Sequence, residues 1–459
     1  MKIKKIAKNC ILCILLILSS CDSDDNNSTT ILSSDNFITE FVFTAILNDE
    51  LSQDVIASID QENQTISATF PANTSINSLK PSITISNLAS VDPESELSID
   101  LNSNITYTVT AENSSKRIYT LETTVLEPLT DREILEIFYN ANPNNTLDWD
   151  LSSNNMSNWT GVTIVNDRVT ELDLHFKNIE NIPSEFGGLT ALEKLFIYFN
   201  QINNLPDTFG NLTKLKVLNI DDNNLGNYPE ILENLTSLEA LSLGNNQISS
   251  LPTSIGNLSD ELIMFNVSQN NLTNIPSEIG NLTNLANINF AFNNISDLPP
   301  EIGNLNQVWK LDLSDNNLVQ LPTEIGNMTS LEQLHLEYNQ LTSLPETIGN
   351  LSNLEVTYFN NNQINSIPAS VGSLNSLIIL RLDSNLITSI HPNIGLLQNI
   401  ISINLSDNQI SSIPSEMGSL NTLQSLNLMN NNLTTIPQEV CDLELTGTSI
   451  QKDDNVNCL

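Results

Sequence analysis

Few residues in this 459-residue chain are placed for catalysis. The three histidines, His175, His335 and His391, belong to no H-E-x-x-H sequence, and neither a G-x-S-x-G sequence nor a P-loop occurs. A calcium loop of the D-x-[DN]-x-[DN]-G type with its closing Glu is also missing. With 54 acidic residues in the chain, a pair of carboxylates carries little information. The sequence therefore predicts a protein that is not an enzyme and that has no metal or cofactor.

Aromatic and charged side chains at regular spacing are better candidates for function. Exposed rings beside charged groups suit a protein interface or a surface that stacks on sugars. The candidate ligand-binding residues form an early aromatic group and a looser later group with charged neighbours: Phe176, Phe196, Tyr198 and Phe199, then Asp221, then Phe292, Trp309, His335, Glu337, Tyr338, Tyr358, Arg381 and Asp383.

These candidates all fall in a repeat that occupies residues 169–445. One copy starts at Leu331 and begins Leu-Glu-Gln-Leu-His-Leu-Glu-Tyr-Asn-Gln-Leu-Thr-Ser-Leu-Pro-Glu-Thr-Ile-Gly-Asn-Leu. The step is 23 residues, except 24 in the fourth copy, where the extra residue falls in Ser259-Asp-Glu. Such a period indicates a solenoid. The twelve copies begin at Val169, Leu192, Leu215, Leu238, Leu262, Leu285, Val308, Leu331, Leu354, Leu377, Ile400 and Leu423.

Each copy contains the pattern of a short strand with one buried face. Positions four and six are apolar around a polar fifth position, so positions three, five and seven should point to the opposite side, with position eight at its rim. Leu-Pro then ends the strand, and we expect the later Gly to take a positive φ. An Asn at position nine should bond backbone groups where the strand bends: Asn200, Asn223, Asn246, Asn270, Asn293, Asn316, Asn339, Asn362, Asn385, Asn408 and Asn431. The first copy has Lys177 instead.

The repeated residues resemble the leucine-rich repeat family over about 60% of the chain. The resemblance implies an α/β-type solenoid, a horseshoe with a parallel β-sheet on its concave face, and ligand recognition by that face. Two interpretations of the eighth-position aromatics stay open: they contact a ligand, or they cover the bend after the strand. Acids outnumber bases nine to three at positions three, five, seven and eight, which favours a partner with a basic patch.

The chain begins with a basic and then apolar segment, residues 1–20, typical of a secretory signal and too short to span a membrane. Leu18-Ser-Ser-Cys21 resembles a bacterial lipobox, which implies lipidation of Cys21. An ordinary signal peptide with an incidental Cys is the alternative. The acidic residues that follow resemble the export signal of Bacteroidota-type surface lipoproteins, although a solvated tether over 21–36 would look similar. These features predict an outer-membrane, cell-surface protein anchored by lipid.

Two smaller segments precede the repeats. Residues 37–127 have strand-like alternation and a hairpin pattern at 105–123, resemble an Ig-like module of such lipoproteins, and should form a small antiparallel sandwich that acts as a spacer. Residues 128–168 resemble the N-terminal cap of plant-type leucine-rich-repeat receptors in Trp149 and in Trp159-Thr-Gly-Val, but lack its cysteines. A capping box predicts a helix from Thr130. Packing of the two tryptophans should close this end of the solenoid.

The last segment, 446–459, should form the C-terminal cap. If lipidation uses Cys21 and the protein is exported, the resemblance to a lipoprotein implies that Cys441 and Cys458 form a disulfide. Free buried thiols are the alternative.

Charge and surface chemistry together predict a non-catalytic binding protein at the cell surface. After loss of residues 1–20 the chain has 54 acids and 12 bases, a net charge of −42, which argues against nucleic acid as a partner. We expect recognition of a protein or peptide, in adhesion or host contact. The alternative is capture of a glycan for a nutrient-uptake system, in which the exposed rings would stack on sugars.

Overall fold

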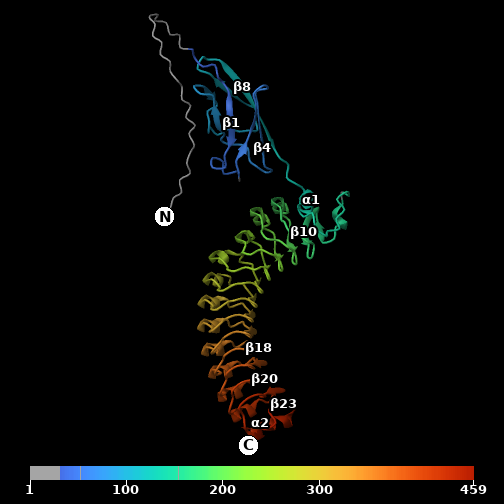
Figure 1. Ribbon diagram of the computed structural model, residues 1–459, viewed down its shortest axis with the longest axis vertical. Helices are drawn as coiled ribbons and strands as arrows, with labels where there is room; N and C mark the ends of the chain where they lie inside the picture. The colour runs from blue at the N-terminus through green and yellow to red at the C-terminus, as the bar shows by residue number, and fades with distance from the viewer. Residues whose placement is uncertain (1–30, 52, 154) are drawn as a thin grey trace, which may run out of the picture. The chain divides into compact units, whose positions relative to one another are not determined.

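The computed structural model describes residues 31–51, 53–153 and 155–459. The chain divides into two compact units, Met1–Pro128 and Leu129–Leu459, which are described separately below (Figure 1). The predicted signal segment 1–20, Cys21 and most of the predicted tether lie outside the described residues.

The first unit is all β, as predicted, and its two sheets enclose one core. The sheet orders are β2-β1-β5 and β3-β4-β8-β7-β6. Buried rings of Phe41, Phe43, Phe70, Tyr107 and Tyr119 fill the space between them. The strand bounds are β1 Ile38–Phe43, β2 Val55–Ile56, β3 Ser58–Asp60, β4 Thr65–Phe70, β5 Ser82–Ile85, β6 Ser90–Asp92, β7 Ile105–Thr110 and β8 Lys116–Val125.

The predicted hairpin is confirmed, since β7 and β8 pair antiparallel with Tyr107 opposite Tyr119. The prediction of a purely antiparallel sandwich is wrong at one place, because β4 and β8 run parallel, with Thr65 opposite Thr120. The chain between these strands passes through the other sheet, which gives it the length that a parallel connection needs.

The second unit confirms the leucine-rich repeat solenoid. Its 14-stranded sheet contains one parallel strand from each of the twelve copies, paired with a constant offset. In each three-residue strand the middle side chain is buried and its two neighbours are partly exposed. The strands are β10 Arg168–Asp173, β11 Lys194–Phe196, β12 Val217–Asn219, β13 Ala240–Ser242, β14 Met264–Asn266, β15 Asn287–Asn289, β16 Lys310–Asp312, β17 Gln333–His335, β18 Val356–Tyr358, β19 Ile379–Arg381, β20 Ser402–Asn404 and β21 Ser425–Asn427.

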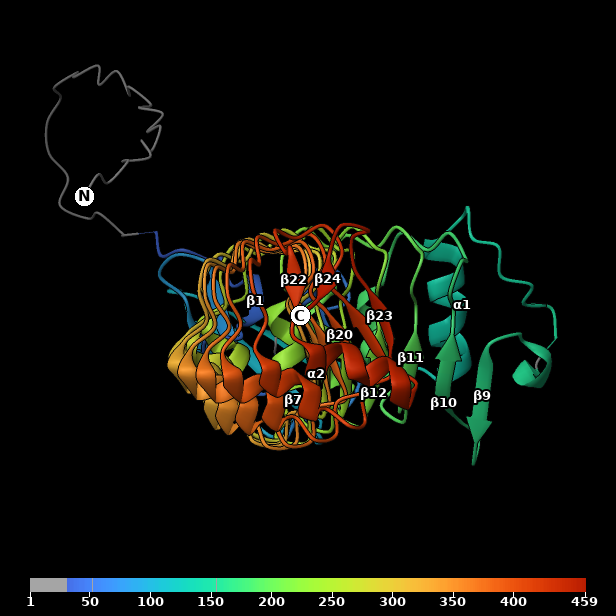
Figure 2. The same cartoon turned by 90° about the horizontal axis from the view of Figure 1, so that it is seen from below.

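Short 3-10 turns after the Leu-Pro step form the other side of the coil. Figure 2, which looks along the stack, shows successive coils lying nearly behind one another. In Figure 1 the turns lie on the outside of the bend of this unit and the sheet lies on the inside. The turns span Ser184–Gly188, Asp207–Asn211, Glu230–Asn234, Thr253–Asn257, Ser277–Asn281, Pro300–Asn304, Thr323–Asn327, Glu346–Asn350, Ala369–Ser373, Pro392–Leu396 and Ser415–Ser419.

The expected positive φ at the repeat glycines is wrong. Among the described glycines only Gly161, Gly226 and Gly447 have it, and none of the three lies in an Ile-Gly-Asn-Leu step. The repeat needs Gly there because coils stack closely: a Cβ on Gly303 would lie 2.4 Å from the carbonyl oxygen of Glu324 in the next turn. Glycine occupies this position because it has no side chain to collide with the next turn, and not because its backbone can take a positive φ.

The ninth-position Asn joins neighbouring coils. The side-chain amide of Asn316 donates to the carbonyl oxygens of Phe290 (3.0 Å), Leu313 (3.2 Å) and Ser314 (3.1 Å), and its oxygen accepts the N–H of Ile295 at 3.0 Å. Two of these four backbone groups belong to the preceding copy. The side chain therefore satisfies backbone groups at the bend and holds two coils in register.

The longer fourth copy keeps this register. Leu241 still pairs with Phe265, although 24 residues separate them. The extra residue is taken up in the loop before β14, where the Ser259 hydroxyl donates to the carbonyl oxygen of Thr236 (2.9 Å) and accepts the N–H of Glu261 (3.1 Å). The insertion leaves the sheet unchanged.

The N-terminal end is closed by a helix and two stacked tryptophans. Helix α1, Asp131–Ala141, begins at the predicted capping box, which is confirmed, with Thr130 as its N-cap. The rings of Trp149 and Trp159 stack at 4.8 Å and are almost fully buried. Strand β9, Val162–Val165, pairs antiparallel with β10 and forms the first edge of the sheet.

The C-terminal end adds a strand that the sequence analysis did not predict. Strand β23, Ser449–Gln451, extends the sheet in parallel beyond β21. Cys441, at the end of helix α2 (Gln438–Cys441), is joined by a disulfide to Cys458, with 6.2 Å between the Cα atoms. Strands β22 (Thr435–Ile436) and β24 (Asn457–Cys458) pair beside it, so the last residues are held against the twelfth copy.

Replacing Asn316 with Ala should lower the free energy of unfolding by about 2 kcal/mol, because four backbone groups at the bend lose their partner. Urea denaturation of fragment 126–459 measures the change. Asn317→Ala is the matched control, because this neighbouring amide only accepts one exposed side-chain bond, from Gln340. Equal losses in both variants would contradict the structural role of position nine.

Fragment 126–459 contains only two cysteines, Cys441 and Cys458. When folded and unreduced it should not react with a thiol reagent, and Cys458→Ser should lower its free energy of unfolding by roughly 3 kcal/mol. Mass spectrometry after labelling, with and without reductant, checks the bond. Labelling of both residues without reductant would show free thiols instead.

Candidate ligand-binding face

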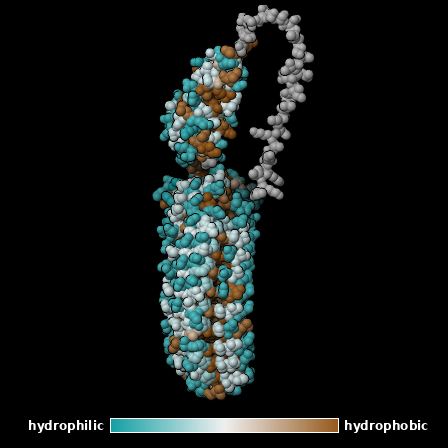
Figure 3. Space-filling model, turned by 90° about the vertical axis from the view of Figure 1, so that its left-hand side faces the viewer, coloured by the Kyte–Doolittle hydropathy of each residue, from teal (hydrophilic) through white to brown (hydrophobic). Residues whose placement is uncertain are grey.

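The inner face of the repeat unit consists of positions three, five, seven and eight of each copy. Positions three and five flank the buried middle residue of each strand, so both project away from the core. Figure 3 views the opposite, outer side, where hydrophilic and neutral residues surround a narrow hydrophobic line along the stack. All predicted binding residues except Trp309 lie on the inner face. Trp309 occupies position two, just before β16, and therefore flanks the face.

The eighth position is left-handed in all twelve copies, with φ between 51° and 57°. This conformation costs an ordinary residue about 1–2 kcal/mol and is rare for bulky side chains. Four copies nevertheless place an aromatic ring there, and the rings stay exposed: Phe176 by 61%, Phe199 by 44%, Phe292 by 54% and Tyr338 by 55%. The four rings are not buried against the bend, so they are accessible from the inner face.

The structure brings together three of the four early aromatics. The rings of Phe176 and Phe199 stack at 4.3 Å, and Tyr198 lies edge-on to Phe199 at 5.7 Å. His175, whose Nδ1 is bonded to Asp173, stacks on Tyr198 at 4.9 Å. We call Phe176, Tyr198, Phe199 and His175 the aromatic cluster. Its rings come from the first two copies and make an exposed apolar platform at the N-terminal end of the face.

Phe196 belongs to a different feature, a hollow of about 520 Å³ over β11–β16. The short side chains of Val217 and Ala240 at position three leave this space open. Each fifth-position Asn in the hollow uses its oxygen to accept the N–H two residues on, as Asn219 does from Asp221 at 3.0 Å and Asn289 from Ala291 at 3.0 Å. The amide N–H groups of Asn219 and Asn289 remain available, whereas Asn266 donates to the Ser242 hydroxyl at 2.8 Å, so the hollow offers donors to a ligand from two of these three residues.

The sequence analysis missed these amides, although Asn recurs at position five. The available signal was an Asn at the last residue of the strand, because an Asn side chain there commonly accepts the backbone N–H two residues on. Four of the fifth-position residues at the hollow are polar: Asn219, Ser242, Asn266 and Asn289.

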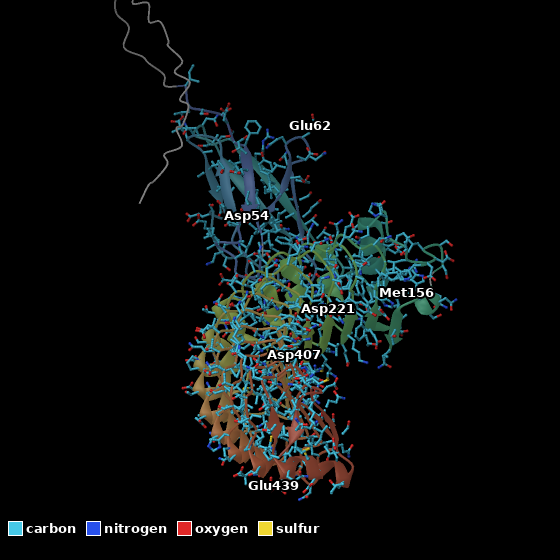
Figure 4. The ribbon with its side chains drawn as sticks, turned by 60° about the horizontal axis from the view of Figure 1, so that its bottom comes forward. Asp54, Glu62, Met156, Asp221, Asp407 and Glu439 are labelled. Atoms are coloured by element: carbon cyan, nitrogen blue, oxygen red, sulfur yellow. A yellow bond between two sulfur atoms is a disulfide. The ribbon has the colours of Figure 1, made fainter. Side chains whose placement is uncertain are left out.

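Asp221 is bonded to Ser242, one of the residues that line this hollow, and Figure 4 marks it beside the green strands of the sheet. Its carboxylate accepts bonds from the hydroxyl of Ser242 (2.7 Å) and from the N–H of Gly244 (2.5 Å). Burial raises the pKa of the Asp221 carboxyl, and these two bonds oppose the shift. A Cβ at Gly244 would come within 3.1 Å of the carboxylate. Asp221 is thus held in place by the next copy.

A charged group lies farther along the face, on β17–β19. Arg381 donates two bonds to Asp383, both at 3.2 Å, and its guanidinium lies 5.8 Å from the ring centre of Tyr358. The His335 ring meets Tyr358 edge-on at 4.8 Å, and its Nδ1 lies 3.7 Å from Glu337 Oε1. Position five supplies three of these residues from consecutive copies. This part of the later predicted group is therefore brought together.

Phe292, Trp309 and Tyr338 are not brought together. Phe292 and Tyr338 are two copies apart at position eight, and within the described part of the chain neither ring pairs with another aromatic. The sequence spacing placed Phe292 and Tyr338 on the same rim of the inner face, but it could not show that their rings lie apart.

Within residues 31–459, apart from the two undescribed positions, no set of three His, Cys, Asp or Glu side chains is arranged to hold a metal ion. The helices described there are also too short or too polar to cross a bilayer.

Comparisons with family models identify both units. Leucine-rich repeat models match residues 171–262, 307–328, 330–351 and 375–433, and a model described as SGBP, N-terminal, matches residues 46–123. SGBP denotes a surface glycan-binding family. No curated protein matches the chain in sequence.

Solved structures with the same fold come from bacteria and plants. A leucine-rich repeat protein of Leptospira interrogans is 31% identical, with 63% of this chain and 79% of that chain covered and a TM-score of 0.53. An internalin of Listeria monocytogenes is 26% identical, with 61% and 86% covered and a TM-score of 0.50. The Arabidopsis receptor kinase HAESA, in complex with a peptide hormone and a co-receptor, is 31% identical, with 66% and 54% covered and a TM-score of 0.57. The chain belongs to the leucine-rich repeat proteins.

Replacing Phe292 with Asn should leave the free energy of unfolding unchanged or raise it by up to about 1 kcal/mol. Asn tolerates the left-handed conformation, and other copies already have Asn at position eight. The reverse change, Asn361→Phe, should lower stability by a similar amount. Urea denaturation compares the two variants. A loss above about 1 kcal/mol in Phe292→Asn would show that the ring stabilises the fold.

Proposed function

We propose that this protein is a non-catalytic binding protein that uses the inner face of its repeats to recognise a protein or peptide outside the cell. The observation that carries the proposal is that four copies hold an exposed aromatic ring in left-handed backbone at position eight, namely Phe176, Phe199, Phe292 and Tyr338. A bulky ring at this position has a conformational cost and gains no burial in return, so it does not stabilise the fold. A contribution to ligand binding is the simpler explanation for these rings.

The charge of the inner face supports a partner with a basic patch. Of its three bases, Lys194 pairs with Glu171 at 3.3 Å and Arg381 pairs with Asp383. Most of the acids on the face therefore have no cation beside them. A negative face of this kind accelerates association with a basic surface and disfavours nucleic acid.

The resemblance to HAESA, which is solved with a peptide hormone, supports a peptide or protein as the ligand class. In this proposal lipidation of Cys21 anchors the protein at the outer surface of the cell, and the Met1–Pro128 unit acts as a spacer. Adhesion or contact with a host or neighbouring cell is the role that suits such a placement.

Glycan capture is the second candidate. The match of residues 46–123 to the N-terminal model of a surface glycan-binding family favours it, but that match lies outside the repeats. On the inner face, the amide donors of the hollow beside Phe196 have the chemistry of a sugar site, since a ring can stack on a sugar while amides bond its hydroxyls.

A direct comparison of ligand classes tests the proposal. Fragment 126–459 is offered a glycan array and is used in a pull-down of host and bacterial surface proteins. We expect a protein partner whose binding weakens at least about tenfold in Tyr198→Ala or Tyr338→Ala, since such exposed rings act as anchors. Binding should also weaken as salt is raised from low to physiological levels.

Glu416→Ala, on the outer turn Ser415–Ser419, is the matched control and should bind like the parent. Tight sugar binding that is lost in Tyr198→Ala, with no protein partner affected by the same change, would overturn the protein assignment in favour of glycan capture.

A further inference from the structure

Three polar atoms on the inner face lack hydrogen-bond partners. They are His335 Nε2, Glu337 Oε2 and Asn360 Oδ1, and no donor or acceptor of the described residues reaches them. His335 and Glu337 occupy positions five and seven of the eighth copy, and Asn360 occupies position seven of the ninth. The Tyr338 N–H donates to the Asn360 carbonyl oxygen at 3.2 Å, so the two copies are in direct register here. The three side chains thus project from one place on the same face.

Two of the three atoms, Glu337 Oε2 and Asn360 Oδ1, can only accept hydrogen bonds. His335 Nε2 also accepts in the neutral ring whose proton is on Nδ1, the nitrogen that faces Glu337 Oε1 at 3.7 Å. Buried acceptors without donors are costly, and Asn360 is only 5% exposed. A native structure that retains three of them together offers a site for a ligand that brings donors.

The surroundings of these atoms are negative. Asp315 of the seventh copy lies near both Glu337 and Asp312, and burial first, then the charges of Glu337 and Asp312, raises the pKa of the Asp315 carboxyl. Arg381, on β19, is held by Asp383, and no base of the described residues donates to the three atoms. A cation is therefore the ligand that the local field favours.

We propose that His335, Glu337 and Asn360 form a subsite for one cationic side chain of the partner, an arginine or a lysine. Arginine fits best, because its guanidinium brings five N–H donors in a fixed plane and stacks on aromatic rings. Tyr358, which already lies between the His335 ring and Arg381, supplies a ring at this subsite. The inference rests on the proposed function and adds to it the residue that the partner must present.

The subsite is closed in the free protein but lies just under an open face. The side chains of His335 and Glu337 are 17% and 21% exposed, although their unpartnered atoms are covered. In the proposed complex Glu337 rotates to present its carboxylate, and the bonds to the incoming cation compensate for that change. Binding therefore involves a local rearrangement of side chains and leaves the sheet unchanged.

The histidines provide a direct test, because the chain has only three. In NMR spectra of the ring Cε1–H groups of the soluble chain 22–459, N-acetyl-arginine amide should shift the His335 signal saturably, with a dissociation constant on the order of millimolar. His175 and His391 are internal controls and should not move. N-acetyl-citrulline amide, which has the same shape without the charge, should have no effect.

Glu337→Gln should weaken the response to the arginine compound at least about tenfold, whereas Asn360→Asp, which keeps the acceptor and adds charge, should retain or strengthen it. Glu332→Gln removes an exposed acid of the same copy and should bind like the parent. An unmoved His335 signal, or an equal response to citrulline, would overturn the subsite. A response to glucosamine and not to the arginine compound would also overturn it and favour the glycan alternative.

The proposed function is tested separately. A protein partner whose affinity is unchanged by Glu337→Gln would leave the binding function standing and remove the subsite. If the arginine compound binds at His335 but the pull-down finds no protein partner, the subsite stands and the proposed binding function is contradicted.

Discussion

The bond between the ninth-position Asn and the backbone of the adjacent coil is the interaction on which the second unit depends. A buried amide that bonds four backbone groups in two copies leaves no freedom in the offset between strands. With that offset set, residue eight must bend through the left-handed region in every copy. Residues five and seven of successive copies then form straight rows on one side of the sheet. The ligand-binding face is thus a consequence of how the coils are held together.

Much of this architecture is predictable from the sequence because it repeats. Twelve copies of one pattern reveal which positions are apolar, where the strand ends and which Asn is buried. The glycine prediction failed because close approach and positive φ both favour glycine in a sequence, and only the contact between Gly303 and the next turn distinguishes them. Strand β23 was missed because it follows the last copy and lacks the repeated pattern. Both errors concern contacts between coils.

The candidate site was predictable to a smaller extent. Alternation identified the side of the sheet that carries Tyr198, Glu337 and Arg381, but it could not show which side chains pair. The stack of Phe176 on Phe199 follows from a shared position in adjacent copies. The orientation of the Asn219 amide and the unpartnered oxygen of Asn360 depend on hydrogen bonds that only coordinates reveal. From the N-terminal to the C-terminal copies, the face carries first an apolar platform, then a donor-lined hollow and last an acceptor-rich acidic stretch. The surface chemistry of the face therefore differs between its two ends.

The loop that absorbs the extra residue of the fourth copy has a consequence for how this protein can diversify. Ser259 accommodates the insertion through local bonds, and the strands on either side keep their pairing. Sequence changes at that flank are therefore uncoupled from the rows of side chains that meet a partner. Gain or loss of a whole copy would likewise lengthen or shorten the sheet by one strand spacing, roughly 4.8 Å, without disturbing the remaining coils. Selection can thus alter the reach of the molecule and the chemistry of its surface independently.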